Sequence, residues 1–178
     1  MTIAAKPSPQ IPGDISIRSA TSADVGTILS LIRDLSVYEN LAHELEVDES
    51  RLAQNLFGPH RYAECLIAEA NGQPAGFALF FHSFSTFLGK PGLYLEDLFV
   101  KPEYRTRGIG LRLFRELARI ALERDCGRME WSVLDWNELA LTFYKKLGAQ
   151  PMSEWTIQRL TRPGIEILAR EPSPADSN

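Results

Sequence analysis

The sequence predicts a mixed α/β fold in which helices lie on both faces of a central β-sheet. Segments of strand and helix character follow one another in the order β-α-α-β-β-β-α-β-α-β-β, which is typical of such a mixed sheet. Asn71-Gly72 is a strong two-residue hairpin signal between two apolar segments. An Arg- and Gly-rich loop, Arg105–Gly110, joins an apolar strand to an amphipathic helix, and the candidate chemistry is organised around this loop.

Length and composition indicate one globular domain. The chain has 178 residues, of which 44% are hydrophobic and 24% charged. We expect a single domain over 14–169 between flexible tails at 1–13 and 170–178. The net charge of −4 argues against nucleic-acid or membrane binding, and no apolar run reaches the length of a membrane span. Met1–Gly13 has no apolar signal core, so we expect a cytoplasmic protein with free cysteines.

Apolar periodicity and capping residues predict the elements of the first half of the chain. Ile15–Arg18 is a short strand, and Thr21 or Ser22 is the N-cap of a helix that ends near Tyr38. The next predicted elements are a helix at Asp48–Phe57 and the hairpin strands Tyr62–Ala70 and Pro74–His82.

The second half of the chain contains the central strand and the amphipathic helix. Ser83–Gly92 is predicted to be a loop, and the strand Leu93–Val100 ends at Lys101-Pro102. A helix from about Gly108 to Arg124 has a single apolar stripe at helical period. The remaining predicted elements are a strand at Arg128–Leu134, a helix at Asn137–Leu147 and a final hairpin of Trp155–Leu160 with Ile165–Leu168.

The loop Arg105–Gly110 has the composition of a pyrophosphate-binding loop. A glycine-rich helix start presents unpaired N–H groups and the positive end of the helix dipole, and Arg105 and Arg107 add full charge. No Gly-Lys-Ser/Thr follows, as a P-loop requires, and Leu113 stands where a dinucleotide-binding loop needs its third glycine. The alternative is an ordinary strand-to-helix turn with surface arginines.

Asn137 and Tyr144 lie seven residues apart on one predicted helix, so both point to the same side. An asparagine amide can pair with the amides of a pantetheine arm, and a phenol can protonate a leaving thiolate. The alternatives are that Asn137 only caps the helix and that Tyr144 only packs in the core.

These motifs resemble the Gcn5-related N-acetyltransferase (GNAT) superfamily, and within it the spermidine/spermine N-acetyltransferases. The resemblance is carried by Tyr94–Val100, by Tyr104-Arg105-x-x-Gly108-Ile109-Gly110 and by Trp136–Ala149, and it covers about Ile15 to Leu168. It implies the acyl-CoA N-acyltransferase fold, whose fourth and fifth strands splay apart around the cofactor. It also implies acetyl-CoA as cosubstrate and a homodimer.

The resemblance assigns roles residue by residue. Tyr144 would be the proton donor, and Glu96 would hold the amine and pass its proton to solvent, directly or through water. Tyr38, Glu39, Glu96 and Glu154 would bind the amine substrate. The cofactor-binding residues would be Leu98, Phe99, Val100, Arg105, Thr106, Arg107, Gly108, Ile109, Gly110, Leu111, Asn137, Glu138, Leu139 and Ala140.

The predicted reaction is transfer of acetyl to a primary amine of a small polyamine or diamine by direct attack in a ternary complex. Cys65, Cys126 and the scattered histidines show no pattern for a covalent acetyl-cysteine or a metal site. Ser83–Gly92 departs from the subfamily, because it lacks the subfamily's acidic residue and tryptophan. Thialysine, another amino acid or protein lysine is therefore an alternative substrate. A third alternative is an acyl-CoA-binding module without catalysis.

Overall fold

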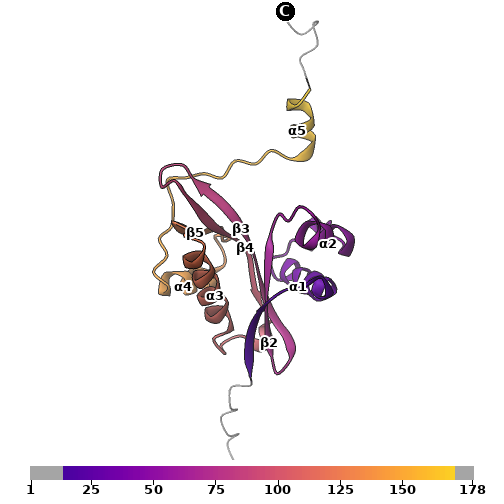
Figure 1. Cartoon of the computed structure of the whole chain (residues 1–178), viewed down its shortest axis with the longest axis vertical. Coiled ribbons are helices and arrows are strands. Elements are labelled where there is room, and N and C mark those ends of the chain that lie inside the picture. The colour runs from indigo at the N-terminus through magenta and orange to yellow at the C-terminus, as the bar shows by residue number, and fades with distance from the viewer. Residues whose placement is uncertain (1–13, 171–178) are drawn as a thin grey trace, which may run out of the picture. The chain divides into compact units, whose positions relative to one another are not determined.

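The computed structural model describes residues 14–170 and contains one five-stranded sheet in the order β1-β2-β3-β4-β5 (Figure 1). Its neighbouring strands are antiparallel except for β4 and β5, which are parallel, so the sheet is mixed as predicted. The strands are β1 (Ile15–Ser19), β2 (Glu64–Ala70), β3 (Gln73–Ser85), β4 (Lys90–Val100) and β5 (Arg128–Trp131). The tail predicted at 1–13 lies outside the described residues, as does the tail at 170–178 apart from Arg170.

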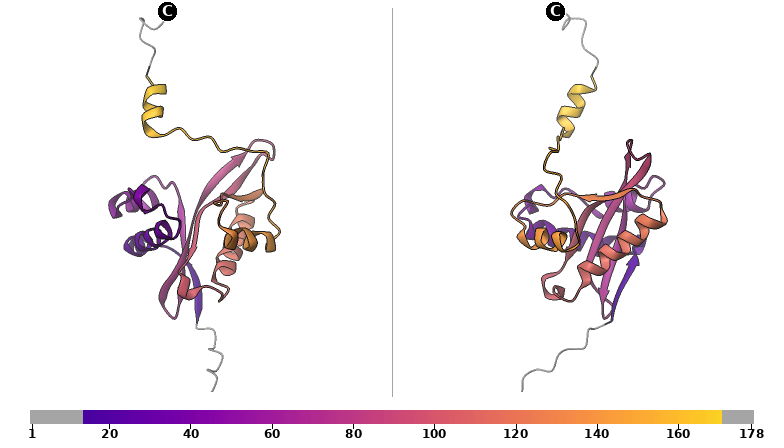
Figure 2. Two further views of the ribbon diagram at one scale, coloured as in Figure 1. Left: turned by 180° about the vertical axis from the view of Figure 1, so that it is seen from behind. Right: turned by 90° about the vertical axis from the view of Figure 1, so that its left-hand side faces the viewer.

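Helices cover both faces of this sheet. The α-helices are α1 (Val25–Tyr38), α2 (Glu49–Phe57), α3 (Ile109–Glu123), α4 (Glu138–Lys146) and α5 (Arg162–Leu168). Short 3-10 turns occur at Ser22–Asp24, Ala42–Glu44 and Pro102–Tyr104. The first pair, α1 and α2, lies on one face and α3 on the other (Figures 1 and 2). None of the helices in residues 14–170 is long and apolar enough to cross a membrane.

The apolar stripes of the helices form the core on each face. On the α1 face, Ile28 and Leu31 are fully buried in a cluster with Ile67, Phe77 and Phe99 of the sheet. On the other face, the α3 stripe predicted from the sequence is buried at every position: Ile109, Leu113, Phe114, Leu117, Ile120 and Ala121. The sheet is therefore held between two apolar layers, one under α1 and α2 and one under α3.

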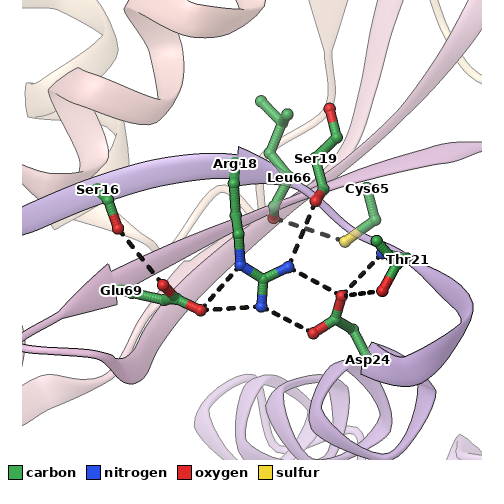
Figure 3. Close-up of polar contacts among 8 residues, drawn as sticks. All are labelled: Ser16, Arg18, Ser19, Thr21, Asp24, Cys65, Leu66 and Glu69. Atoms are coloured by element: carbon green, nitrogen blue, oxygen red, sulfur yellow. Dashed lines mark hydrogen bonds and ion pairs between the residues drawn. The ribbon is translucent and has the colours of Figure 1, made fainter.

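A polar network ties the first strand to the first helix (Figure 3). The Arg18 guanidinium donates to both carboxylate oxygens of Asp24, at 2.9 and 2.8 Å, and to Glu69 of β2 at 2.9 Å. Thr21, one of the two predicted caps, is the N-cap of the Ser22–Asp24 turn that leads into α1, and it forms a capping box with Asp24. The hydrogen bonds from the Arg18 guanidinium hold the pKa of Asp24 well below its usual range, and the positive charge of Arg18 adds to the effect.

The hairpin at Asn71-Gly72 is confirmed, because both residues have positive φ (53° and 72°), as a type I′ turn requires. The loop predicted at Ser83–Gly92 is wrong for most of its length. There β3 and β4 continue to pair through Ser83↔Gly92 and Ser85↔Lys90, which leaves a short turn that contains Gly89. The two strands approach closely at this pair: a Cβ on Gly92 would lie 2.6 Å from the Ser83 hydroxyl oxygen, so a glycine fits there.

The final hairpin predicted at Trp155–Leu160 and Ile165–Leu168 is also wrong. Residues 155–160 form no strand, and the second segment lies within α5. Thr161 is the extended N-cap of this helix, and Pro163 stands in its first turn, where its fixed φ favours a helix. Arg162 Nε donates to Glu166 at 2.7 Å, an i,i+4 pair that further stabilises α5.

Contacts divide the chain into two compact units, with the boundary after Ser132. The first contains the whole sheet with α1, α2 and α3, and the second contains α4 and α5. A single domain over 14–169 stays a prediction.

Candidate active site

The strand β4 runs beyond the end of its parallel neighbour. The hydrogen-bonded pairs of β4 with β5 run from Gly92↔Arg128 to Leu95↔Trp131, whereas β4 continues to Val100. Beyond Leu95 the edge that faced β5 therefore passes the end of that strand, which agrees with the predicted splay. Main-chain groups of Leu98–Val100 on such an edge can pair with the amides of an extended ligand.

The loop after β4 ends in an open helix N-terminus. Gly108 is the N-cap of α3 with φ 78°, and Thr106 also has positive φ (63°), which is uncommon for a residue with a side chain. The first intrahelical hydrogen bond runs from Arg112 N to Gly108 O at 3.0 Å. The N–H groups of Ile109, Gly110 and Leu111 precede it and remain available to an anion.

The side chains of this loop take different directions. Thr106 Oγ1 donates to Arg105 O at 2.6 Å, so its hydroxyl supports the turn itself. Arg107 lies over the Tyr104 ring, with Cζ 5.5 Å from the ring centroid. Arg105 turns back toward β4, where its Nε donates to Val100 O at 2.9 Å. The N–H groups of the helix start and the arginine-bearing loop would suit the pyrophosphate of acetyl-CoA, and the edge of β4 beyond its pairing with β5 would suit the pantetheine arm. Both cofactor contacts stay predictions.

A β-bulge in β4 presents Glu96. Leu95 pairs with Phe80 and Asp97 with Leu79, so Glu96 is the extra residue between two consecutive pairs. A bulge changes the direction of the side chain at the extra residue. Glu96 therefore does not follow the alternation of side chains between the two faces of the sheet, and it is exposed. The predicted role of Glu96 toward an amine stays a prediction, and this geometry is compatible with it.

The neighbouring Asp97 is a candidate that the assignment from sequence missed. It lies opposite Leu79, which packs against the α1-side core, so its carboxyl is largely buried on that face. Burial raises the pKa of Asp97 to about 6, and the charges of Glu96 and Glu39 add to the effect. The sequence did contain a signal for Asp97, because it is a carboxyl in a mainly apolar strand. Acidic residues are rarely buried, and those that are often belong to a functional site.

Tyr38 and Glu39 stand at the C-terminal end of α1. Tyr38 is the last residue of the helix, and its ring centroid lies 6.3 Å from that of Phe99 on β4. Glu39 is the C-cap, and burial raises the pKa of its carboxyl. The structure thus brings Tyr38 to the end of β4. The charge of Glu39 contributes to the raised pKa of Asp97.

The other predicted site residues belong to the second unit. Asn137 caps α4, because its side-chain oxygen accepts from Ala140 N at 3.2 Å, so capping is confirmed as at least one of its roles. Glu138, Leu139 and Ala140 form the first turn of α4. Tyr144 lies in the same helix beside Phe143, with ring centroids 5.5 Å apart. Glu154 is exposed and precedes Trp155 in a turn.

The cysteines are poorly suited to nucleophilic chemistry. Burial raises the pKa of the Cys65 thiol to about 12, so it stays protonated at neutral pH. Burial also raises the pKa of Cys126. Within residues 14–170, no group of His, Cys, Asp and Glu side chains has the arrangement of a metal site.

The sheet, its helices and the glycine loop define an acyl-CoA-dependent acetyltransferase fold. The model of the acetyltransferase (GNAT) family matches residues 29–149, and the chain belongs to this family. Its members use acetyl-CoA as cosubstrate.

Curated relatives narrow the class. The chain is 41% identical over 148 residues to the thialysine N-epsilon-acetyltransferase of Bos taurus, which covers 79% of this chain and 86% of the relative. It is 32% identical to the L-ornithine N5-acetyltransferase NATA1 of Arabidopsis thaliana, over 85% of this chain and 86% of the relative. It is also 33% identical to the human spermidine/spermine N(1)-acetyltransferase-like protein 1, over 87% of this chain and 24% of that protein.

Solved structures agree with the fold. An integron cassette protein from the mobile metagenome of V. cholerae has a TM-score of 0.72 and 28% identity, covering 88% of this chain and 98% of that chain. A ribosomal-protein-alanine N-acetyltransferase from Brucella melitensis biovar Abortus has a TM-score of 0.66 and 21% identity, covering 83% and 99% respectively. The predicted GNAT fold, with a mixed sheet and helices on both faces, is confirmed.

Proposed function

We propose that this protein acetylates the side-chain amine of a small lysine-like amino acid of the thialysine type, with acetyl-CoA as donor. The observation that carries the proposal is the 41% identity to an enzyme named for thialysine. The relative named for L-ornithine, another amino acid with a terminal amine, supports the same substrate class. The sequence alone ranks a polyamine first and a thialysine-type amino acid second. The curated relatives reverse this order.

The acidic residues of the first unit supply the chemistry that a cationic amine requires. Glu96 and Glu39 offer carboxylates, and Asp97 adds a third when it ionises above about pH 6. The amine must lose a proton before it attacks, and Glu96 accepts this proton directly or through water. The main-chain groups of Leu98–Val100 hold the pantetheine arm, and the N–H groups of Ile109–Leu111 hold the pyrophosphate.

The second unit supplies the leaving-group chemistry. Acetyl-CoA brings an activated acyl carbon: the amine nitrogen forms a bond to this carbon, and the carbon–sulfur bond breaks. By the resemblance, Tyr144 would donate its phenolic proton to the leaving sulfur, and the residues from Asn137 to Ala140 would bind the cofactor. The high pKa of Cys65 argues against an acetyl-cysteine route, and direct attack in a ternary complex is the simpler path.

A polyamine is the second candidate substrate, because the chain is also similar to a spermidine/spermine N(1)-acetyltransferase-like protein. The hairpin at Ser83–Gly92 supports the shorter substrate. Its exposed side chains, Phe84 at the end of β3 and Phe87 and Leu88 in the turn, carry no charge that would bind the far end of a long polycation. An acyl-CoA-binding module without catalysis is a third candidate from a different class.

An amine panel with acetyl-CoA tests these candidates. Thiol release is measured with thialysine, ornithine, lysine, a lysine peptide, putrescine and spermidine. We expect the highest kcat/KM with thialysine. A higher kcat/KM with spermidine would instead select the polyamine. If calorimetry shows acetyl-CoA binding but no amine gives thiol release, the non-catalytic binding module is the remaining candidate. If no binding is detected at millimolar acetyl-CoA, acetyltransferase activity is rejected.

The proton-donor role of Tyr144 is tested by Tyr144→Phe. We expect kcat to fall by about 10²-fold or more, with little change in acetyl-CoA affinity, because a general acid acts only as the thiolate leaves. Phe143→Leu, at the neighbouring position of α4, is the packing control and should retain most of the turnover. An unchanged kcat in Tyr144→Phe would remove Tyr144 as the acid.

Assembly and location belong to the same proposal. The resemblance to the spermidine/spermine acetyltransferases supports a homodimer, and the free thiols of Cys65 and Cys126 support a cytoplasmic location. Light scattering coupled to gel filtration measures the first. A mass of 20.0 kDa, which is that of a single chain, would contradict it.

A further inference from the structure

The Arg105 side chain connects three elements of the first unit. Its Nε donates to Val100 O at the end of β4, at 2.9 Å. Its Cζ lies 4.4 Å from the ring centroid of Tyr38, the last residue of α1, and 5.8 Å from that of Phe99. A guanidinium over an aromatic face is attracted by the ring electrons, and partial burial strengthens the attraction. One side chain thus joins the glycine loop, the end of α1 and the end of β4.

The contact with Tyr38 has a consequence for the residue that follows it. Glu39 is the C-cap of α1, so its backbone position depends on where the last turn of the helix lies. Tyr38 also contacts Phe99, with ring centroids 6.3 Å apart and planes at 51°. The ring of Tyr38 therefore touches both Arg105 and Phe99, and Glu39 is carried on the backbone that this ring anchors.

Arg107 provides a contrast within the same loop. It lies over Tyr104, which is three residues away, with Cζ 5.5 Å from the ring centroid. This contact is local to the loop and its flanking turn, and the described contacts give Arg107 no link to α1. Both arginines are candidate ligands for a phosphate, but Arg105 is the one that reaches the end of the helix bearing Glu39.

We propose that Arg105 is a positioning residue that fixes the amine-binding end of α1 to the cofactor loop. The inference rests on the proposed function for the meaning of Tyr38 and Glu39 as the amine subsite. In this arrangement a shift of the loop is transmitted to Tyr38 through the guanidinium. The end of β4 moves with both, because Val100 O accepts from the same side chain.

The first experiment compares Arg105→Met with Arg107→Met. With acetyl-CoA saturating, we expect Arg105→Met to raise the amine KM about tenfold, the change that loss of one partly buried cation–π contact would produce. Arg107→Met should raise the KM for acetyl-CoA and leave the amine KM within about twofold of wild type. Arg105→Lys keeps a cation over the ring and should restore part of the amine KM. An amine KM that is unchanged in Arg105→Met, with only acetyl-CoA affected, would overturn the proposal.

The second experiment needs neither cofactor nor turnover. The denaturant midpoints of the free protein are measured for Arg105→Met, Tyr38→Leu and the double variant. If the two side chains act together, the midpoint shift of the double variant is smaller than the sum of the single shifts. Additive shifts would contradict the link. A wild-type protein that turns over no amine would end the proposed function, whereas this cycle would still report on the contact itself.

Discussion

At the residue scale, Asp97 is a carboxyl whose placement makes sense for function and not for stability. It occupies a core-facing position opposite Leu79, and burial raises its pKa to about 6. An apolar residue there would extend the α1-side core without a desolvation penalty. Proteins retain such acids where a site needs them, and Glu96 and Glu39 are close enough to influence its ionisation.

Replacing Asp97 with Asn should therefore stabilise the protein at neutral pH. The carboxyl pKa is higher in the folded than in the unfolded chain, so the folded state binds more protons between about pH 4 and 6 and its stability falls as pH rises through that range. At pH 8 we expect Asp97→Asn to raise the free energy of unfolding by roughly 1–3 kcal/mol, and at pH 4 by much less. Denaturant titrations at both pH values measure this. Asp125→Asn, at an exposed acid, is the control.

The same substitution should alter the pH dependence of the reaction. In the wild type the amine KM is expected to fall as pH rises through about 6, because ionised Asp97 adds negative charge to the amine subsite. In Asp97→Asn this inflection should disappear and the amine KM should be higher at pH 8. Initial rates with thialysine from pH 5 to 8 would decide it. An inflection that persists in the variant would assign it to another group, such as Glu39.

At the element scale, the strand–loop–helix unit of β4 and α3 is the best predicted part of the molecule. The apolar stripe, the Pro102 stop and the Gly108 start all act within a few residues of sequence, so local chemistry determines them. The elements that were predicted wrongly depend on partners elsewhere. The Ser83–Gly92 segment pairs across a hairpin, with Gly92 packed closely against Ser83, and α5 forms where a paired strand was expected.

Comparing alanine substitutions at Gly108 and Gly89 distinguishes the cost of backbone strain from a role of the Arg105–Gly110 loop in acetyl-CoA binding. Gly108 and Gly89 both have positive φ, 78° and 63°, and a Cβ on either would meet no atom within 4 Å. Ala at either position should therefore cost about 1 kcal/mol of folding stability through backbone strain alone. We expect only Gly108→Ala to weaken acetyl-CoA binding in calorimetry, since Gly89 lies at the opposite end of β4. Equal loss of binding in both variants would contradict the assignment of the loop.

At the scale of the whole molecule, the first unit has a polar tie between its sheet and its α1 layer. Arg18 of β1 joins Glu69 of β2 to Asp24, which immediately precedes α1 (Figure 3). The pairs span the edge of the sheet and the start of a helix, so they orient one layer on the other. Part-buried charges that satisfy one another are also costly to separate, because either one left alone keeps its desolvation penalty.

This tie should make the protein sensitive to acid. The pKa of Asp24 is depressed in the folded state, so its contribution is complete above the unfolded value of about 4 and is lost as pH falls below it. Asp24→Asn should lower the free energy of unfolding at pH 7 by about 1–3 kcal/mol, and the difference from wild type should shrink toward pH 2. Urea titrations across this range test it. Glu123→Gln, on the surface of α3, should cost less than about 0.5 kcal/mol.

The sequence by itself determined the elements and motifs that depend on near neighbours. The Asn71-Gly72 turn, the Thr21 cap and the α3 stripe are local in this sense. So are the motifs at Tyr94–Val100, Arg105–Gly110 and Trp136–Ala149, whose resemblance to the GNAT superfamily identified the fold and its cosubstrate. Tertiary structure alone decided that Asp97 is half-buried within reach of the charge of Glu39 and that Arg105 lies over Tyr38. These two interactions join residues more than fifty positions apart, and they follow from how the end of α1 lies against β4. No periodicity within either segment encodes that packing.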